Sequence, residues 1–139
     1  MVLRLVHKLS PRHVVQLHEL YQTQWWTRGR SLASVQSMVR RSDSNFFFCL
    51  IDPDDNDNMV GFTRVLSDCV YKALIFDVIV KEGYRKRGLG VRLMESLQGH
   101  PELSDVKHFE LYCHPDMVQY HKKLGFTDEL SNLVLMRKG

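Results

Sequence analysis

Residues 77–94 read DVIVKEGYRKRGLGVRLM and carry the most specific pattern in the chain. The stretch opens with an apolar, β-branched run typical of a buried strand. It continues through a basic loop with two glycines into apolar residues at helical spacing. A loop that leads from a strand into a helix leaves backbone N–H groups without partners at the positive end of the helix dipole. The stretch therefore predicts an anion-binding loop.

The residues of this loop suit a pyrophosphate. Gly88 and Gly90 have no Cβ, so a phosphate can approach the backbone closely. Arg85, Arg87 and Arg92 add fixed positive charge and forked donors. The sequence has neither the Walker pattern nor the third glycine of the dinucleotide fingerprint. A different phosphate-binding family is expected.

Residues 85–90, RKRGLG, match Arg/Gln-x-x-Gly-x-Gly and resemble the acetyl-coenzyme A loop of the GCN5-related N-acetyltransferases, the GNAT superfamily. Residues 120–126, YHKKLGF, resemble the family's Phe-Tyr-Glu-Lys-Leu-Gly-Phe segment. The resemblance covers residues 45–137 by motif and implies an acetyl-CoA-dependent N-acetyltransferase without a metal. It also implies the cofactor-binding residues, which are the backbone of Val78, Ile79 and Val80 together with Arg85, Lys86, Arg87, Gly88, Leu89, Gly90 and Arg92.

Length and composition are those of one globular domain, residues 1–139, with 44% hydrophobic and 25% charged residues. The net charge of +3 is mild, and no nucleic-acid motif or sustained basic stripe is present, so no nucleic-acid partner is expected. No apolar run approaches the length of a membrane span. Cys49, Cys69 and Cys113 lie far apart in apolar runs, which predicts buried thiols and a cytoplasmic location.

The order of elements predicts an α/β (α+β) fold. Strands are expected at residues 2–6, 45–51, 59–66, 71–80, 106–113 and 130–136, and helices at 11–24, 32–39, 89–98 and 114–124. Single helices between strands imply a mixed sheet with parallel neighbours and helices on both faces. This order is similar to the GNAT fold, a mostly antiparallel sheet whose fourth and fifth strands splay apart to admit the pantetheine arm.

Acyl transfer from a thioester to an amine needs a proton donor for the departing thiolate. The family's tyrosine is replaced by His121, and Tyr120 takes the place of the preceding phenylalanine. Either side chain is a candidate general acid, and water is the alternative.

Asp77 is the one carboxylate in an apolar strand, so it is either the general base or a structural acceptor. Residues 76–80 are also similar to a segment of glucosamine-6-phosphate N-acetyltransferases.

The acceptor pocket of GNAT enzymes usually involves the segment between the first two helices. Trp25 and Trp26 lie there, and we expect one to pack inward and the other to line the pocket, where it can hold a cationic amine. Arg28 and Arg30 would instead favour an acceptor with a carboxylate or phosphate. The sequence does not decide between these acceptors.

The expected reaction is direct transfer of an acetyl group to a small-molecule amine. One alternative is a protein or peptide N-acetyltransferase, and another is a non-catalytic acyl-CoA-binding module. Many family members pair through their C-terminal strands, so the resemblance leaves a homodimer open.

Overall fold

The computed structural model describes residues 2–139, and its centre is a five-stranded sheet in the order β1-β2-β3-β4-β5. Neighbouring strands run antiparallel except β4 and β5, which are parallel. The mixed, mostly antiparallel sheet is thus confirmed. The strands are β1 (Arg4–Val6), β2 (Phe47–Asp52), β3 (Asn58–Ser67), β4 (Lys72–Val80) and β5 (His108–Glu110).

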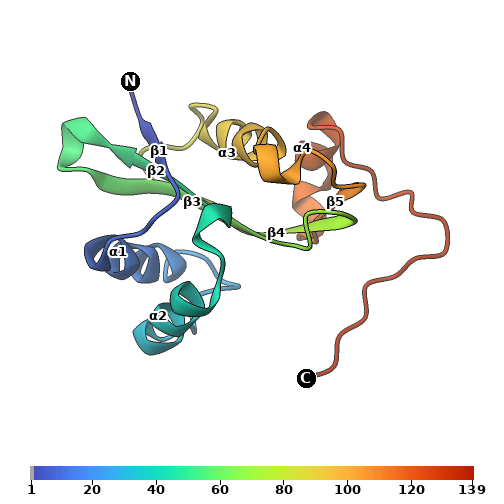
Figure 1. Ribbon diagram of the computed structural model, residues 1–139, viewed down its shortest axis with the longest axis horizontal. Helices are drawn as coiled ribbons and strands as arrows, with labels where there is room; N and C mark the ends of the chain where they lie inside the picture. Colours follow the sequence, from blue (N-terminus) through green and yellow to red (C-terminus); the bar gives the residue numbers. More distant parts are fainter. Residues whose placement is uncertain (1) are drawn as a thin grey trace.

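Helices cover both faces of the sheet (Figure 1). One face carries α1 (Pro11–Tyr21) and α2 (Leu32–Arg41), and the other carries α3 (Leu89–Gln98) and α4 (Val118–Lys123). Short 3-10 turns connect them, namely η1 (Ser44–Phe46), η2 (Pro53–Asp55), η3 (Pro101–Leu103) and η4 (Pro115–Met117). Within residues 2–139, no helix has the length and apolar character needed to cross a membrane.

The sequence explains where the helices begin. Ser10 caps α1 by accepting a hydrogen bond from the backbone N–H of His13, and Pro11 follows at the first helical position. Ser31 caps α2 through the N–H of Ser34. Helix α3 begins differently, because its N-cap is Gly88 and no side chain caps it. Its first N–H groups therefore remain available to a ligand.

Strand β2 supplies side chains to two hydrophobic cores because alternate residues point to opposite faces. Phe48 and Leu50 pack in the core on the α3 side. Phe47, Cys49 and Ile51 pack in the core on the α1–α2 side. All five are fully or almost fully buried. Burial of this order, about 1.5–3 kcal/mol for each large side chain, makes the sheet the rigid support for the site.

A β-bulge interrupts β4 where it pairs with β3. Thr63 alone lies opposite Asp77 and Val78, and Asp77 has a positive φ of 57°. Before the bulge, the odd-numbered residues of β4 face α3. After the bulge, the even-numbered residues face it. The bulge therefore turns Phe76 and Asp77 toward the same face, the one covered by α1 and α2.

Strands β4 and β5 separate soon after they meet. They pair only from Lys72 to Leu74, opposite His108 to Glu110. Strand β4 then continues to Val80 with no strand beside it on that edge among residues 2–139. The predicted splay between the fourth and fifth strands is confirmed.

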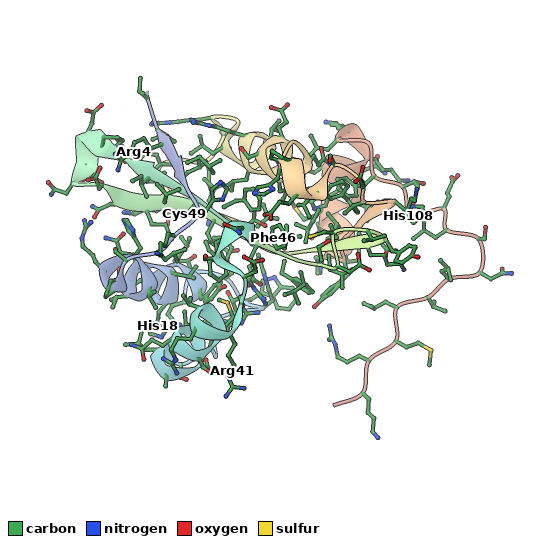
Figure 2. All side chains as sticks on the ribbon, viewed as in Figure 1. Arg4, His18, Arg41, Phe46, Cys49 and His108 are labelled. Carbon is green, nitrogen blue, oxygen red and sulfur yellow. The ribbon has the colours of Figure 1, made fainter. Side chains whose placement is uncertain are left out.

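The strand expected at residues 130–136 is wrong. After α4 the chain leaves the body of the molecule and runs to the C-terminus as an extended, unpaired segment (Figure 1). Leu133, Val134, Leu135 and Met136 in this segment are exposed (Figure 2). Near the end of the segment, the Arg137 guanidinium lies 5.7 Å from the centre of the Tyr112 ring. A strand needs a paired edge, and β5 forms only three ladder positions.

Other sequence expectations need smaller corrections. Helix α1 ends at Tyr21 rather than near residue 24, and the helix expected at 114–124 divides into η4 and α4. The division follows from His114, whose ring accepts from the N–H of Asp116 and starts a separate turn. All three cysteines are free, but only Cys49, labelled in Figure 2, is buried, and Cys113 is exposed.

Candidate active site

The basic loop after β4 is held by contacts with the neighbouring strands. The Arg85 Nε donates to the carbonyl of Val80 at 3.0 Å, which folds the side chain back on the strand end. The Tyr84 hydroxyl donates to the Asp52 carboxylate at 2.7 Å. The Arg87 guanidinium lies 5.6 Å from the centre of the Tyr84 ring. Arg85, Lys86 and Arg87 are exposed, so their charge faces solvent and any ligand at this loop.

The loop enters α3 through Gly88, which has a left-handed φ of 77° that favours glycine. Gly90, the second residue of the helix, has a different reason to lack a side chain. A Cβ at Gly90 would lie 2.6 Å from the hydroxyl oxygen of Tyr120. Gly90 thus permits a close approach of α4 to the first turn of α3, a contact that the sequence did not predict.

Two of the cofactor-binding residues that the resemblance implies also contact other parts of the protein. Arg92 donates from Nη2 to the carbonyl of Leu3 at 3.0 Å and so ties α3 to the chain just before β1. Leu89 is buried in the α3-side core, which leaves its backbone as the part that can face a ligand. The roles of both residues toward the cofactor stay predictions.

The β4 bulge suits the backbone role expected of Val78, Ile79 and Val80. A bulge leaves the extra residue unpaired in the ladder, so its N–H and carbonyl can meet a ligand. The Thr63 hydroxyl donates to the Phe76 carbonyl at 2.8 Å and satisfies one acceptor that the irregular register exposes. Because β5 ends early, this edge of β4 remains open.

Tyr120 and His121, the two candidate general acids, lie in different surroundings. The Tyr120 hydroxyl lies at the first turn of α3, beside Gly90, and burial raises the pKa of Tyr120. The His121 ring packs against Tyr120 and Phe126, with ring centres 5.2 Å and 5.9 Å away. His121 is buried, its Nδ1 has no hydrogen-bond partner among residues 2–139, and burial lowers the pKa of its ring. His121 is therefore neutral near pH 7.

Asp77 lies at the centre of a buried polar cluster. Its Oδ2 accepts from the Tyr21 hydroxyl at 2.8 Å, the Arg30 Nη1 at 2.9 Å and the Arg64 Nε at 2.7 Å. Burial opposes ionisation of Asp77, but the Arg30 hydrogen bond and the Arg64 charge outweigh it and lower the pKa of the carboxyl group. Burial and the Asp77 charge raise the pKa of Tyr21. A carboxylate held in this way is a weak base.

The tryptophans of the α1–α2 segment are both exposed, at 66% for Trp25 and 46% for Trp26, so the expectation that one of them is a core residue is wrong. The rings lie 5.9 Å apart, and Trp25 also lies 5.9 Å from His114 at the start of η4. This contact joins the α1–α2 segment to the segment after β5. Arg28 is exposed, whereas Arg30 reaches Asp77.

Sequence reasoning missed Arg64 and Tyr21 as members of the site. Arg64 could have been noticed by the argument that singled out Asp77, because it is an arginine within an otherwise apolar strand. Tyr21 gave no signal, since its spacing is that of an ordinary core position on α1. Residues 2–139 contain no group of three or more metal-ligating side chains suitably placed for an ion.

A cavity of about 320 Å³ adjoins the Asp77 cluster. It is lined by side chains from α1, α2, β3 and the segment between the helices, namely Tyr21, Arg30, Ser34, Val35, Met38 and Arg64. The site thus has an exposed basic loop at one end of β4 and a partly open, charged cavity beside the bulge.

Comparison with known proteins identifies the family. The sequence model described as Acetyltransferase (GNAT) family matches residues 9–126. The uncharacterized N-acetyltransferase ycf52 of Pyropia yezoensis is 30% identical over 125 residues, which is 87% of this chain and 70% of that protein. Across similar relatives from three algae, the chain spans 66% to 70% of the relative's length.

Comparison with solved structures gives the same family. A GNAT-family protein from Xanthomonas campestris pv. campestris is 25% identical with a TM-score of 0.80, covering 100% of this chain and 94% of that one. Glucosamine-6-phosphate N-acetyltransferase from Arabidopsis thaliana has a TM-score of 0.71 at 17% identity over 100% of this chain and 99% of that one, which shows the shared fold. The chain belongs to the GNAT acetyltransferase family, and its activity is acetyl transfer.

Proposed function

We propose that the protein transfers an acetyl group from acetyl-CoA directly to the primary amine of a small molecule. The observation that carries the small-molecule part is the cavity beside the β4 bulge. Its volume of about 320 Å³ lies at the lower end of the range for small-molecule sites. Helix α2 and the segment before it supply most of its lining, and a volume of this size suits a small acceptor.

The cofactor lies on the α3–α4 side in this proposal. The uncapped start of α3 and the exposed loop arginines receive the pyrophosphate. The pantetheine arm follows the open edge of β4 after Leu74, where β5 no longer pairs with it. Backbone groups at Val78 then polarise the thioester carbonyl, as the family resemblance implies.

Tyr120 is the proton donor in our proposal. Its hydroxyl lies at the first turn of α3, near the expected path of the cofactor, and the raised pKa keeps it protonated at neutral pH. His121 is the weaker candidate, because a neutral buried imidazole is a poor acid. The departing thiolate, with a thiol pKa of about 8.5 for a cysteine-like group, accepts the proton as the amide forms.

The protonation state of the cysteine thiols supports direct transfer without an acetylated enzyme intermediate. Burial raises the pKa of Cys49 to about 12. Burial, with the charge of Asp128, also raises the pKa of Cys113. Both cysteines stay protonated near pH 7, and thiols are much weaker nucleophiles than thiolates. An acetyl intermediate on Cys49 or Cys113 is therefore disfavoured.

The test is a thiol-release assay with acetyl-CoA over a panel of small amines and short peptides, with products identified by mass. Acetylation of small amines and no acetylated protein in the absence of acceptor support the proposal. Acetylation of peptides alone would make the protein a peptide N-acetyltransferase. Calorimetric binding of acetyl-CoA without any turnover would favour a binding module.

A further inference from the structure

The cavity beside the β4 bulge carries an excess of positive charge. Two guanidinium groups, of Arg30 and Arg64, meet a single carboxylate oxygen, Asp77 Oδ2. Among residues 2–139, neither arginine has an ion pair with any other carboxylate. The cluster therefore keeps a net charge of about +1, in surroundings where the Arg64 side chain is only 15% exposed. An excess charge in such a place favours an anion nearby.

The two guanidinium groups are fixed in position. Arg30 lies 4.6 Å from the centre of the Tyr21 ring, and Arg64 lies 5.0 Å from the centre of the Phe76 ring. Each arginine also donates one hydrogen bond to Asp77. Contacts of this kind remove the conformational entropy that a free arginine would lose on binding a ligand.

Both arginines have donors beyond those that bond to Asp77. A guanidinium group carries five N–H donors, and among residues 2–139 the bond to Asp77 uses one donor of each group. Arg30 also has a side-chain hydrogen bond with Tyr21. Both arginine side chains line the cavity, whereas the Ser34 hydroxyl in the same lining already donates to the Ser31 carbonyl. Forked N–H pairs match the oxygens of a carboxylate or phosphate.

The cavity also lies next to the expected reaction centre. Asp77, which holds both arginines, directly precedes Val78, whose backbone is expected to polarise the thioester. An anionic group bound to Arg30 and Arg64 would hold an amine a few bonds away at the bulge. Both parts of such an acceptor would then be oriented, which is the main requirement of direct transfer.

We propose that Arg30 and Arg64 bind an anionic group of the acceptor, so that the substrates are primary amines carrying a carboxylate or a phosphate. This inference rests on the proposed acetylation of small amines and narrows it to one substrate class.

The experiment compares acceptors that differ only in the anionic group. β-Alanine is paired with β-alaninamide for the carboxylate, and O-phosphoethanolamine with ethanolamine for the phosphate. We expect kcat/KM to be about 10- to 100-fold higher for the charged member of at least one pair, since charge-assisted contacts are the strong ones. The pair with the larger ratio identifies which anion the site prefers.

Arg30→Gln tests whether the cavity causes the preference. Arg30 lies outside the helices and strands and is partly exposed, so the variant is expected to fold. It should use both members of each pair about equally, while acetyl-CoA affinity by calorimetry stays unchanged. Arg40→Gln is the matched control, because it removes the same charge from an exposed position of α2 outside the cavity.

A second variant and a binding readout cover the case in which Arg30→Gln folds poorly. Arg30→Lys keeps the charge and loses the fork, so it should retain only part of the preference. Inorganic phosphate should raise the melting temperature of the parent and of Arg40→Gln, and raise that of Arg30→Lys less.

The outcomes separate this inference from the proposed function. Equal use of charged and neutral amines by the parent, or an unchanged preference in Arg30→Gln, would overturn the anionic substrate class while leaving small-amine acetylation intact. If the parent acetylates peptides alone, the proposed function fails and this inference fails with it.

Discussion

Arginines approach strand β4 at two places, and the two groups are built differently. Arg85 and Arg87 follow the strand in one contiguous loop and face solvent. Arg30 and Arg64 come from separate parts of the chain and converge on Asp77 in a largely buried site. The first group can be recognised from a short motif, whereas the second exists only in the folded protein. We call the first group the proposed cofactor end of the site and the second the proposed acceptor end.

The largest expected effect concerns Tyr120 at the cofactor end. Tyr120→Phe removes the hydroxyl beside Gly90 and keeps the ring, so turnover should fall by about 10²–10⁴-fold if the hydroxyl is the general acid. Acetyl-CoA affinity, measured by calorimetry, should change little. Tyr71→Phe, at an exposed tyrosine, is the control. Normal turnover in Tyr120→Phe with a loss in His121→Ala would move the acid role to His121.

The second prediction concerns the stability that the buried Asp77 cluster contributes to the folded protein. Asp77→Ala leaves two guanidinium groups and a tyrosine hydroxyl without their shared acceptor. The free energy of unfolding should fall by about 3–5 kcal/mol, the usual cost of breaking a buried pair. Asp105→Ala, at an exposed carboxylate, is the comparison in the same denaturant titration. Equal losses in the two variants would contradict a stabilising role for the cluster.

The lowered pKa of Asp77 also predicts how the free energy of unfolding depends on pH. The folded-state pKa of Asp77 is below its ordinary value, so the unfolded state binds the proton more readily. The stabilisation is therefore complete above the unfolded pKa of about 3.9 and is lost as the pH falls through the lower folded value. The difference in unfolding free energy between the parent and Asp77→Ala should shrink below about pH 4. A difference that stays constant down to pH 2 would show that ionised Asp77 is not its source.

The third prediction tests the close approach of α4 to α3. The new Cβ of Gly90→Ala would lie 2.6 Å from the Tyr120 hydroxyl, so the Tyr120 ring or the helix that carries it must shift. Overpacking of this kind costs about 1–3 kcal/mol, which we expect to appear as weaker acetyl-CoA binding and lower stability. In the Tyr120→Phe background the cost should be smaller, since the clashing oxygen is gone. Gly29→Ala, with no heavy atom within 4 Å of its new Cβ, is the control for stability. Equal costs with and without the hydroxyl would contradict the contact.

The smallest expected effect concerns the exposed tryptophans. Trp25→Ala and Trp26→Ala should each change the free energy of unfolding by less than about 1 kcal/mol, because neither side chain is buried. The variant that lines the acceptor entrance should raise the KM for the amine several-fold and leave the KM for acetyl-CoA unchanged. Unchanged kinetics in both variants would exclude the two tryptophans from acceptor binding.

Local features of the sequence were sufficient for the family and for most elements. The strand, glycine loop and helix at residues 77–94 depend on backbone torsions and on neighbours in the chain, which is why RKRGLG pointed to the family. The caps Ser10 and Ser31 bond to backbone N–H groups only three residues away, so they too depend on neighbours in the chain. Asp77 stood out for the same local reason, as a carboxylate in an apolar run.

Tertiary structure alone decided what Asp77 does. Its partners Tyr21, Arg30 and Arg64 lie 56, 47 and 13 residues away in sequence, and only the packing of α1 and β3 brings them together. The unpaired C-terminal segment has a similar cause, because residues 130–136 have a strand-like composition but β5 gives them little edge to join. Pairing and burial depend on which distant segments meet, so a pattern within one segment could predict the element but not its contacts.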